Sequence, residues 1–188
     1  MGGRVEVIVG PMFSGKTEEL LRRVRRLKYS KQKHMLFKHS LDKRYSSDSI
    51  TSHCKDSEKC IPVCDSSELL ECVEKNMSSV DVIAIDETQF FDNKIVDVAW
   101  KLANAGKRVI VAGLDMDYLG KTFGSMGDLL AIADSVMKVK AVCYVCGEDA
   151  TFSKRIVQNN NTIVVGGVEM YTAVCRKHFL HCDKNINE

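Results

Sequence analysis

Short apolar runs alternate with longer segments of helical spacing over the first 140 residues of the chain. Most of these runs are apolar at consecutive positions, which is typical of parallel strands buried on both faces. Their alternation with helical segments predicts an α/β fold, in which crossover helices connect the strands of a parallel sheet. The predicted strands are residues 5–9, 35–38, 80–85, 108–112 and 136–140.

A helix is predicted directly after the first strand, within GKTEELLRRVRRLKYS. Leu20, Val24 and Leu27 recur there at helical spacing, and Leu21 widens this apolar stripe. We interpret the basic residues on the other side of the helix as a solvated face, and not as a surface for nucleic acid. They are Arg22, Arg23, Arg25, Arg26 and Lys28.

The periodicity weakens over residues 40–79, which are rich in Ser, Asp, Lys and Cys. We predict a long polar connection there, partly mobile, with one capped helix within SSELLECVEK. The pattern changes again near residue 141, where CYVCGED opens a segment that includes CRKH. The sequence therefore predicts two domains, residues 1–140 and residues 141–188.

Length and charge limit the classes of function. With 188 residues, 45% of them apolar, the chain can form one full core, or one domain and a small appendage. Its 27 basic and 25 acidic residues leave a net charge of +2, which does not demand a polyanionic partner. No apolar run approaches the ~20 residues of a membrane span, and the first residues lack a signal-peptide core. We therefore expect a cytoplasmic protein without membrane or nucleic-acid partners.

Eight cysteines raise the question of disulfides or metal ligands. Without an export signal, reduced thiols are the better expectation. CYVC at residues 143–146 and CRKH at residues 175–178 have the paired spacing of a tetrahedral Zn²⁺ site, structural because four ligands leave no position for water. The spacing leaves the fourth ligand open, since His181 or Cys182 could replace His178. The other candidate ligands are Cys143, Cys146 and Cys175.

GPMFSGKT at residues 10–17 matches G-x-x-x-x-G-K-[ST] in full and lies between a predicted strand and a predicted helix. In this context the backbone N–H groups of the loop bind the β- and γ-phosphates of a nucleotide. Lys16 adds a positive charge, and the Thr17 hydroxyl can ligate Mg²⁺. The candidate phosphate-binding residues are Gly10, Pro11, Met12, Phe13, Ser14, Gly15, Lys16 and Thr17.

VDVIAIDE predicts a buried strand that ends in Asp86 and Glu87. Because ligands bind at the carboxyl edge of a parallel sheet, both side chains should face the phosphate-binding loop. Asp86 would hold Mg²⁺, directly or through a water. Glu87 is then available for proton transfer, from water in an ATPase or from a substrate hydroxyl in a kinase.

These motifs together resemble those of type II thymidine kinases, the kind also encoded by large DNA viruses. The chain carries, in order over residues 4–179, GPMFSGKT, ELLRRVRR, DKRYSS, DETQFF, ANAGKRVIVAGLD, AVCYVC, FSKR and GGVEMYTAVCRKH. The resemblance implies a RecA-like P-loop sheet with flanking helices and a small zinc-binding lasso domain. It also implies ATP-dependent phosphorylation of the 5′-hydroxyl of thymidine or deoxyuridine, for pyrimidine deoxynucleotide salvage.

The resemblance implies roles for the phosphate-side residues. Glu87 would accept the 5′-hydroxyl proton, while Lys16, the loop amides and Mg²⁺ stabilise charge on the transferring γ-phosphoryl group. Arg44, in DKRYSS, would act as an electrostatic clamp near the phosphates. The residues expected at the nucleotide beyond the phosphate-binding loop are Asp42, Lys43, Arg44, Asp86, Glu87, Thr88 and Gln89.

In this family a loop called the lasso extends from the zinc site and closes the nucleoside pocket, binding the base largely through backbone groups. The lasso maps to residues 152–171 of this chain. The resemblance implies side-chain contacts from Ser153 and Tyr171, and an apolar lining around them. The expected nucleoside-binding residues are Met12, Phe90, Leu114, Tyr118, Phe123, Ser153, Thr162, Ile163, Val164, Val165, Gly166 and Tyr171.

The chain departs from the family pattern in three places. Tyr118 stands where many members have Phe, which adds a hydroxyl at the sugar-facing wall. LDMDYLGKTFG differs from the LDGTFQRKPFG-like run of many relatives, and CRKH ends in His where several relatives have Cys. The family commonly forms homotetramers and is inhibited by the triphosphate end product dTTP, so both properties are implied here.

Two other functions are compatible with parts of the sequence. A DNA-stimulated P-loop ATPase with a zinc module would use Glu87 to activate water, but the basic helix lacks the interleaved aromatic residues that stack on bases. A zinc-ribbon interaction module with a vestigial loop is disfavoured because the residues of the chemistry are intact: Lys16, Thr17, Asp86 and Glu87.

Overall fold

The computed structural model describes residues 2–41, 49–51, 57–157 and 167–181. Within this part, six strands form one sheet in the order β5-β2-β6-β7-β1-β8. All neighbouring strands run parallel, which confirms the predicted α/β class. The strands are β1 (Arg4–Val9), β2 (His34–His39), β5 (Ile61–Val63), β6 (Val82–Asp86), β7 (Arg108–Gly113) and β8 (Ser135–Lys138).

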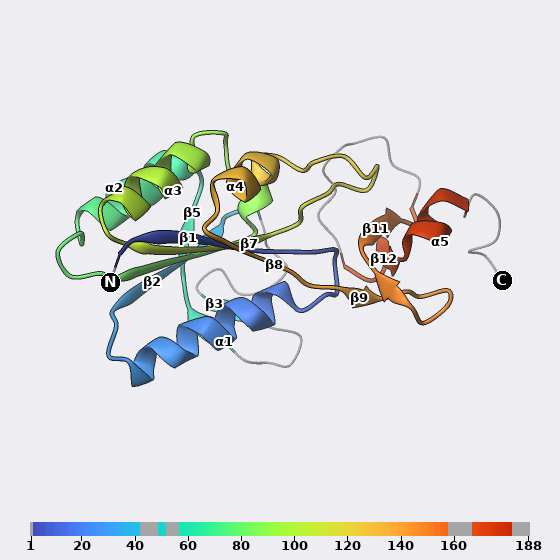
Figure 1. Cartoon of the computed structure of the whole chain (residues 1–188), viewed down its shortest axis with the longest axis horizontal. Helices are drawn as coiled ribbons and strands as arrows, with labels where there is room; N and C mark the ends of the chain where they lie inside the picture. Colours follow the sequence, from blue (N-terminus) through green and yellow to red (C-terminus); the bar gives the residue numbers. More distant parts are fainter. Residues whose placement is uncertain (1, 42–48, 52–56, 158–166, 182–188) are drawn as a thin grey trace.

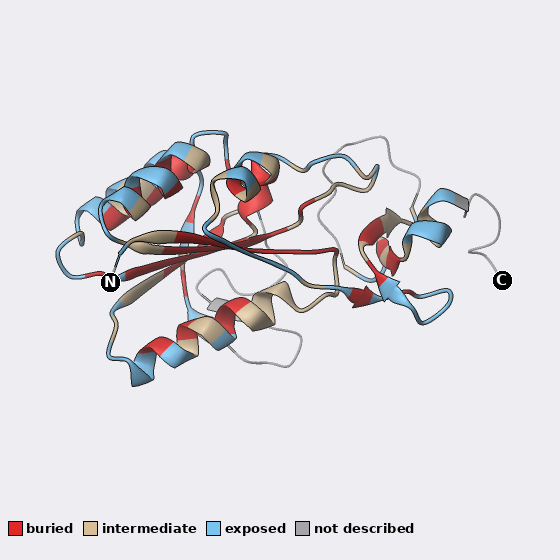
Figure 2. Cartoon of the chain, viewed as in Figure 1, coloured by how far each residue is buried: buried red, intermediate tan, exposed pale blue. Residues whose placement is uncertain are grey.

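Helices cover both faces of this sheet (Figure 1). α1 (Lys16–Tyr29) lies on one face, and α2 (Ser66–Glu74), α3 (Ile95–Asn104) and α4 (Met126–Ile132) lie on the other. Figure 2 shows buried residues where the helices meet the sheet and exposed residues on their outer sides. The sheet is therefore the middle layer of three, and its strand ends are the places where a ligand can reach it.

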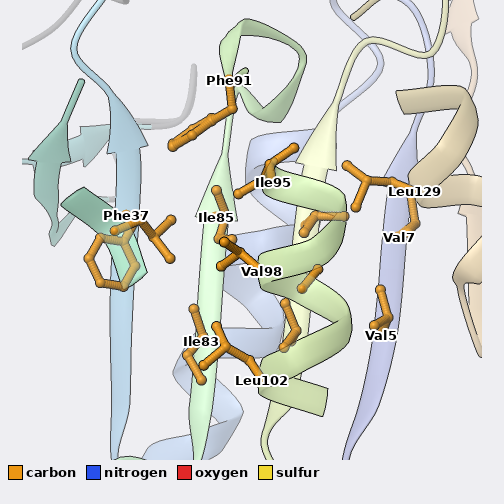
Figure 3. Close-up of a cluster of buried hydrophobic side chains, with 14 of the residues drawn as sticks. Val5, Val7, Phe37, Ile83, Ile85, Phe91, Ile95, Val98, Leu102 and Leu129 are labelled. Atoms are coloured by element: carbon orange, nitrogen blue, oxygen red, sulfur yellow. The ribbon is translucent and has the colours of Figure 1, made fainter. Parts of the chain in front are cut away.

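The apolar stripe of each helix forms the core. On α3, Ile95, Val98 and Leu102 belong to the same buried cluster as Ile83 and Ile85 of β6 (Figure 3). Each such side chain contributes roughly 1.5–3 kcal/mol when it is buried. On the opposite face, the residues of the predicted stripe of α1 are buried against the sheet: Leu20, Leu21, Val24 and Leu27.

Two of the predicted strands differ from the structure in position or burial. The strand predicted at residues 80–85 begins only at Val82, because the Val80 N–H donates to the Asn76 carbonyl in the turn after α2. The last predicted strand, β8, lies at the edge of the sheet, where Val136 and Met137 are 48% and 39% exposed. Its apolar residues therefore do not indicate burial on both faces.

The segment from residue 40 to residue 79 contains more regular structure than predicted. The predicted helix is α2, whose first turn is capped by the Asp65 side chain, which accepts from the Glu68 N–H at 2.8 Å. The structure adds a hairpin of β3 (Ser49–Thr51) and β4 (Ser57–Lys59), and it places β5 beside β2. The three-residue β5 lacks a sequence signal because it contains Pro62, which an edge strand tolerates.

After β8 the chain leaves the sheet and forms a C-terminal module, defined here as residues 141–157 and 167–181. The module lies beyond the carboxyl ends of the sheet strands (Figure 1). It contains the antiparallel pairs β9–β10 and β11–β12, followed by α5. Its elements are β9 (Ala141–Val142), β10 (Asp149–Ala150), β11 (Phe152–Arg155), β12 (Tyr171–Val174) and α5 (Arg176–His181). Its own buried cluster consists of Ala141, Cys143, Ala150, Phe152, Ala173 and Val174.

Over the described residues, no helix is both long enough and apolar enough to cross a bilayer.

Candidate functional site

The phosphate-binding loop, residues 10–17, connects β1 to α1 as the sequence predicts. Gly10 and Gly15 have φ angles of 153° and 81°, which side chains disfavour and glycine adopts readily. A Cβ atom on Gly10 would also collide with the carbonyl oxygen of Val139. Within the loop, the Pro11 carbonyl accepts hydrogen bonds from Lys16 Nζ and from Ser14 Oγ, both at 2.7 Å.

The two residues expected to ligate Mg²⁺ meet at the carboxyl edge of the sheet. Thr17 Oγ1 donates to Asp86 Oδ2 at 3.0 Å. Burial raises the pKa of Asp86 to about 7, and the adjacent Glu87 carboxylate adds to the increase, although hydrogen bonds from the Glu87 N–H and from Thr17 act against it. A hydroxyl and a buried carboxylate are oxygen ligands of the kind Mg²⁺ prefers, and a bound cation favours the charged carboxylate.

Glu87 is held in a fixed orientation directly after β6. Its φ of 52° is in the left-handed region, at the start of the short 3₁₀ helix η1 (Thr88–Phe90). Its backbone N–H donates to Asp86 Oδ1 at 3.0 Å, and its carboxylate accepts from Gln89 Nε2 at 2.6 Å. The half-buried Glu87 carboxylate therefore lies one residue from the Asp86–Thr17 pair and can accept a proton there.

Gln89 connects Glu87 to the loop that follows β7. Its Oε1 accepts from the Leu114 N–H at 3.0 Å. Gln89 lies close to two glycines that have no room for a side chain. A Cβ atom on Gly113 would lie 2.7 Å from Gln89 Oε1, and one on Gly124 would lie 2.5 Å from the Gln89 carbonyl oxygen. The nucleotide contact expected of Gln89 stays a prediction, and in the structure its side-chain amide donates to Glu87 and accepts from the Leu114 N–H.

Aromatic residues expected at the nucleoside form two groups. Phe90 and Phe123 make an edge-to-face pair with ring centroids 5.9 Å apart. In the second group, the Arg155 guanidinium carbon lies 3.7 Å from the centre of the Tyr118 ring, and Nη2 donates to the Tyr171 hydroxyl at 3.0 Å. Sequence reasoning did not assign Arg155, because only the β11–β12 register places it opposite Tyr171.

Met12 and Ser153, both expected at the nucleoside, are connected by a hydrogen bond. The Met12 N–H donates to Ser153 Oγ at 2.9 Å, and Ser153 is buried. This hydrogen bond connects the phosphate-binding loop to β11 of the C-terminal module.

Several other expected residues lie outside the described part of the chain: Asp42, Lys43, Arg44, Thr162, Ile163, Val164, Val165, Gly166 and Cys182.

Four side chains of the C-terminal module converge as a metal site would require. The three cysteine sulfurs and one histidine nitrogen all lie within 4.8 Å of one another. His178 Nδ1 is 3.6 Å from the Cys143 sulfur and 3.2 Å from the Cys175 sulfur, and the Cys146 and Cys175 sulfurs are 3.9 Å apart. Tetrahedral zinc with its usual bond lengths gives edges of roughly 3.6 Å from S to N and 3.8 Å from S to S.

The pKa values of two thiols in this cluster are consistent with metal binding. Burial tends to raise the pKa of Cys143, but hydrogen bonds from the backbone N–H groups of Cys175, Cys146 and Val145 lower it to about 6. A hydrogen bond from the Glu148 N–H tends to lower the pKa of Cys146. Burial and the neighbouring sulfurs together outweigh this hydrogen bond, so the net effect is a raised pKa. Cys143 therefore forms a thiolate more readily than an ordinary cysteine, and a metal ion would supply positive charge beside the Cys146 sulfur. The His181 side chain lies outside the described part of the chain.

Comparisons with known proteins agree on one family. The family model for thymidine kinase matches residues 3–179. A thymidine kinase of Bacteroides thetaiotaomicron is 47% identical over 178 residues, which are 95% of this chain and 87% of that protein. Two thymidine kinases of Bacteroides fragilis are also 47% identical, over 93% of this chain and 86% of each relative.

A solved structure agrees with the fold. The genome packaging NTPase B204 from Sulfolobus turreted icosahedral virus 2, in complex with sulfate, superposes with a TM-score of 0.51 at 17% identity. The superposition covers 73% of this chain and 74% of the viral protein. At this identity the likeness concerns the fold alone, which is that of a P-loop NTPase.

Proposed function

The chain belongs to the thymidine kinase family, and on that premise we propose how its residues transfer the γ-phosphoryl group of ATP to the 5′-hydroxyl of thymidine. The reaction forms the monophosphate for nucleotide salvage. The observation that carries the proposal is the Thr17–Asp86 hydrogen bond of 3.0 Å, because it joins the phosphate-binding loop to the acidic end of β6. Glu87 follows directly and is half-buried at the same edge.

Each residue of this edge has one role in the proposal. The loop amides and Lys16 bind the phosphates, and Thr17 and Asp86 would hold Mg²⁺, which supplies positive charge for the phosphoryl oxygens. Glu87 accepts the proton of the 5′-hydroxyl as that oxygen attacks the γ-phosphorus, and the bond from the γ-phosphorus to the β–γ bridging oxygen breaks to release ADP. The bond from Gln89 Nε2 keeps the Glu87 carboxylate directed to one place throughout.

The nucleoside is proposed to bind between the loop after β7 and the C-terminal module. Phe90, Phe123 and Tyr118 supply apolar surface, and the backbone of the lasso supplies donors and acceptors for the pyrimidine edge. The resemblance further suggests that deoxyuridine is accepted, that dTTP inhibits, and that the protein is a cytoplasmic homotetramer. In the same proposal, residues 1–140 bind the nucleotide and residues 141–188 carry a structural Zn²⁺ and the lasso.

Transfer of labelled phosphate tests the function directly. The protein is incubated with Mg²⁺ and ATP labelled in the γ-position, and thymidine, deoxyuridine, other nucleosides or single-stranded DNA are added separately. We expect label on thymidine and on deoxyuridine. Release of labelled phosphate that depends on DNA, without any labelled nucleoside, would refute the kinase and indicate an ATPase.

A further inference from the structure

The phosphate-binding loop is packed against the C-terminal module as well as against its own sheet. The Phe13 side chain packs on the buried cluster of the module, against which Cys175 and Phe179 also pack. The adjacent Met12 N–H donates to the buried Ser153 hydroxyl of β11 at 2.9 Å. Figure 1 shows the connection from β1 to α1 extending beyond the sheet toward β9.

Phe13 also has an unusual backbone conformation. Its φ is 65°, in the left-handed region where a bulky side chain is rarely found. Gly10 and Gly15 reach positive φ in the same loop without a side chain. A strained residue of this kind persists only where its surroundings hold it in place, and the Phe13 side chain packs against the buried cluster of the module.

The module contacts the loop after β7 through the same apolar surface. Met116 packs on the buried cluster, and a Cβ atom on Gly120 would lie 3.1 Å from the Phe179 ring. The Phe152 and Phe179 rings stack with centroids 4.4 Å apart and an interplanar angle of 16°, which joins β11 to α5. Two loops at the carboxyl edge of the sheet are therefore supported by one cluster.

We infer that the C-terminal module positions the phosphate-binding loop for ATP, with Phe13 as the positioning residue and the Met12–Ser153 hydrogen bond as its second attachment. The Phe13 ring holds the loop in the conformation whose amides bind the phosphates. The inference rests on the proposed nucleotide site, and it is independent of which acceptor receives the phosphoryl group.

Two replacements of Phe13 distinguish the effect of its ring from the effect of its backbone conformation. Phe13→Gly tolerates positive φ but loses the anchor, whereas Phe13→Leu keeps an apolar side chain. The dissociation constant of MgATP is measured by calorimetry on the full-length, zinc-loaded protein, with far-UV circular dichroism as the folding control. We expect Phe13→Gly to bind MgATP at least about tenfold more weakly, with faster amide exchange at residues 12–15, and Phe13→Leu to remain within about threefold of the wild type.

A pair of variants in α5 tests whether the module positions the phosphate-binding loop. Phe179→Ala removes a ring that stacks on Phe152, and Leu180→Ala removes a neighbouring side chain that is 65% exposed. We expect Phe179→Ala to weaken MgATP binding about threefold or more at unchanged zinc content, and Leu180→Ala to have no effect. Neither residue belongs to the phosphate-binding loop, so a direct contact with ATP does not explain the difference.

The two proposals can fail separately. If Phe13→Gly binds MgATP as tightly as the wild type, or if Phe179→Ala and Leu180→Ala behave alike, the positioning role is refuted while thymidine phosphorylation is unaffected. If the protein does not phosphorylate thymidine but MgATP binding still depends on Phe13, the proposed acceptor is wrong and the positioning role stands.

Discussion

Glu87 and Phe13 both have positive φ angles, of 52° and 65°, although neither is a glycine. Each is held by specific contacts: Gln89 Nε2 donates to the Glu87 carboxylate at 2.6 Å, and the Phe13 ring packs on the module. Backbone strain of this kind is maintained at functional sites because the surrounding structure determines the conformation. At the scale of single residues, the site is therefore preorganised by neighbouring groups and not by intrinsic backbone preference.

Replacement of Glu87 by Gln tests its proposed role as the base. Gln keeps the size of the side chain and an oxygen that can accept from Gln89, but it cannot take up the proton of the 5′-hydroxyl. We expect kcat to fall by roughly 10²-fold or more, the usual contribution of a general base. The dissociation constant of MgATP should change little, which calorimetry measures. An unchanged kcat would show that another group accepts the proton.

Glu6 joins three elements through arginine side chains. Its carboxylate accepts hydrogen bonds from Arg4 of β1, Arg23 of α1 and Arg108 of β7, each at 2.7 Å. Arg23 also binds Glu19, and Lys28 binds Glu58, so part of the basic face of α1 is neutralised within the chain. At the scale of elements, this supports the interpretation of that face as a structural feature.

The stability of the protein should depend on the charge of Glu6. Burial tends to raise its pKa, but the hydrogen bonds from Arg108 and Arg4 lower it from 4.5 to about 2. Because the pKa of Glu6 is lower in the folded state, its charged carboxylate stabilises the fold fully above pH 4.5. This stabilisation is lost as the pH falls toward 2 and the carboxylate takes up a proton. We expect Glu6→Gln to be less stable than the wild type by on the order of 3 kcal/mol at pH 7, because the partly buried Arg4, Arg23 and Arg108 all lose the charge of the Glu6 carboxylate.

Urea unfolding of both proteins at several pH values measures this contribution. The difference in unfolding free energy should be largest at neutral pH and should shrink between pH 4.5 and pH 2. The Lys101→Gln variant is the control, because Lys101 of α3 pairs with Glu74 of α2 at the surface, whereas the arginines that bind Glu6 belong to β1, α1 and β7. A difference that stays constant over this range would contradict the assignment.

The whole molecule combines a nucleotide-binding sheet with a module that contacts two of its loops. Phe13 and Met116 pack on the cluster of the module from different loops, and Cys143 belongs both to that cluster and to the group that could hold a metal ion. A structural zinc contributes folding free energy to the segment that binds it. The proposed zinc site is therefore connected to the proposed ATP site through one small apolar core.

Loss of the metal should consequently weaken nucleotide binding as well as nucleoside binding. Cys146→Ser removes one ligand, and Cys64→Ser is the control because both cysteines are exposed and only Cys146 belongs to the cluster. We expect Cys146→Ser, or chelation of the wild type, to lower the zinc content and to weaken MgATP binding at least about tenfold, a change of 1.4 kcal/mol. Metal analysis and calorimetry provide the two readouts. Unchanged MgATP binding in zinc-free protein would show that the two sites are independent.

The local sequence was sufficient to predict the class of the fold and most of its strands. The buried runs that became β1, β2, β6 and β7 were recognisable because their character depends on adjacent residues. β5 and the β3–β4 hairpin were missed, since their short polar segments become strands only through pairing partners elsewhere in the chain. The exposure of β8 was not predictable either, because its position at the edge follows from the strand order.

The sequence by itself determined the chemical groups and the family. The spacing within GPMFSGKT, the acidic pair after VDVIAI, and the C-x-x-C and C-x-x-H pairs are local patterns that predict groups for binding phosphate, magnesium and zinc. Only the tertiary structure decided which groups meet. Thr17 and Asp86 are 69 residues apart in the chain, and Met12 and Ser153 are 141 apart. Such contacts depend on how elements pack, and this packing is what joins the phosphate-binding loop to the C-terminal module.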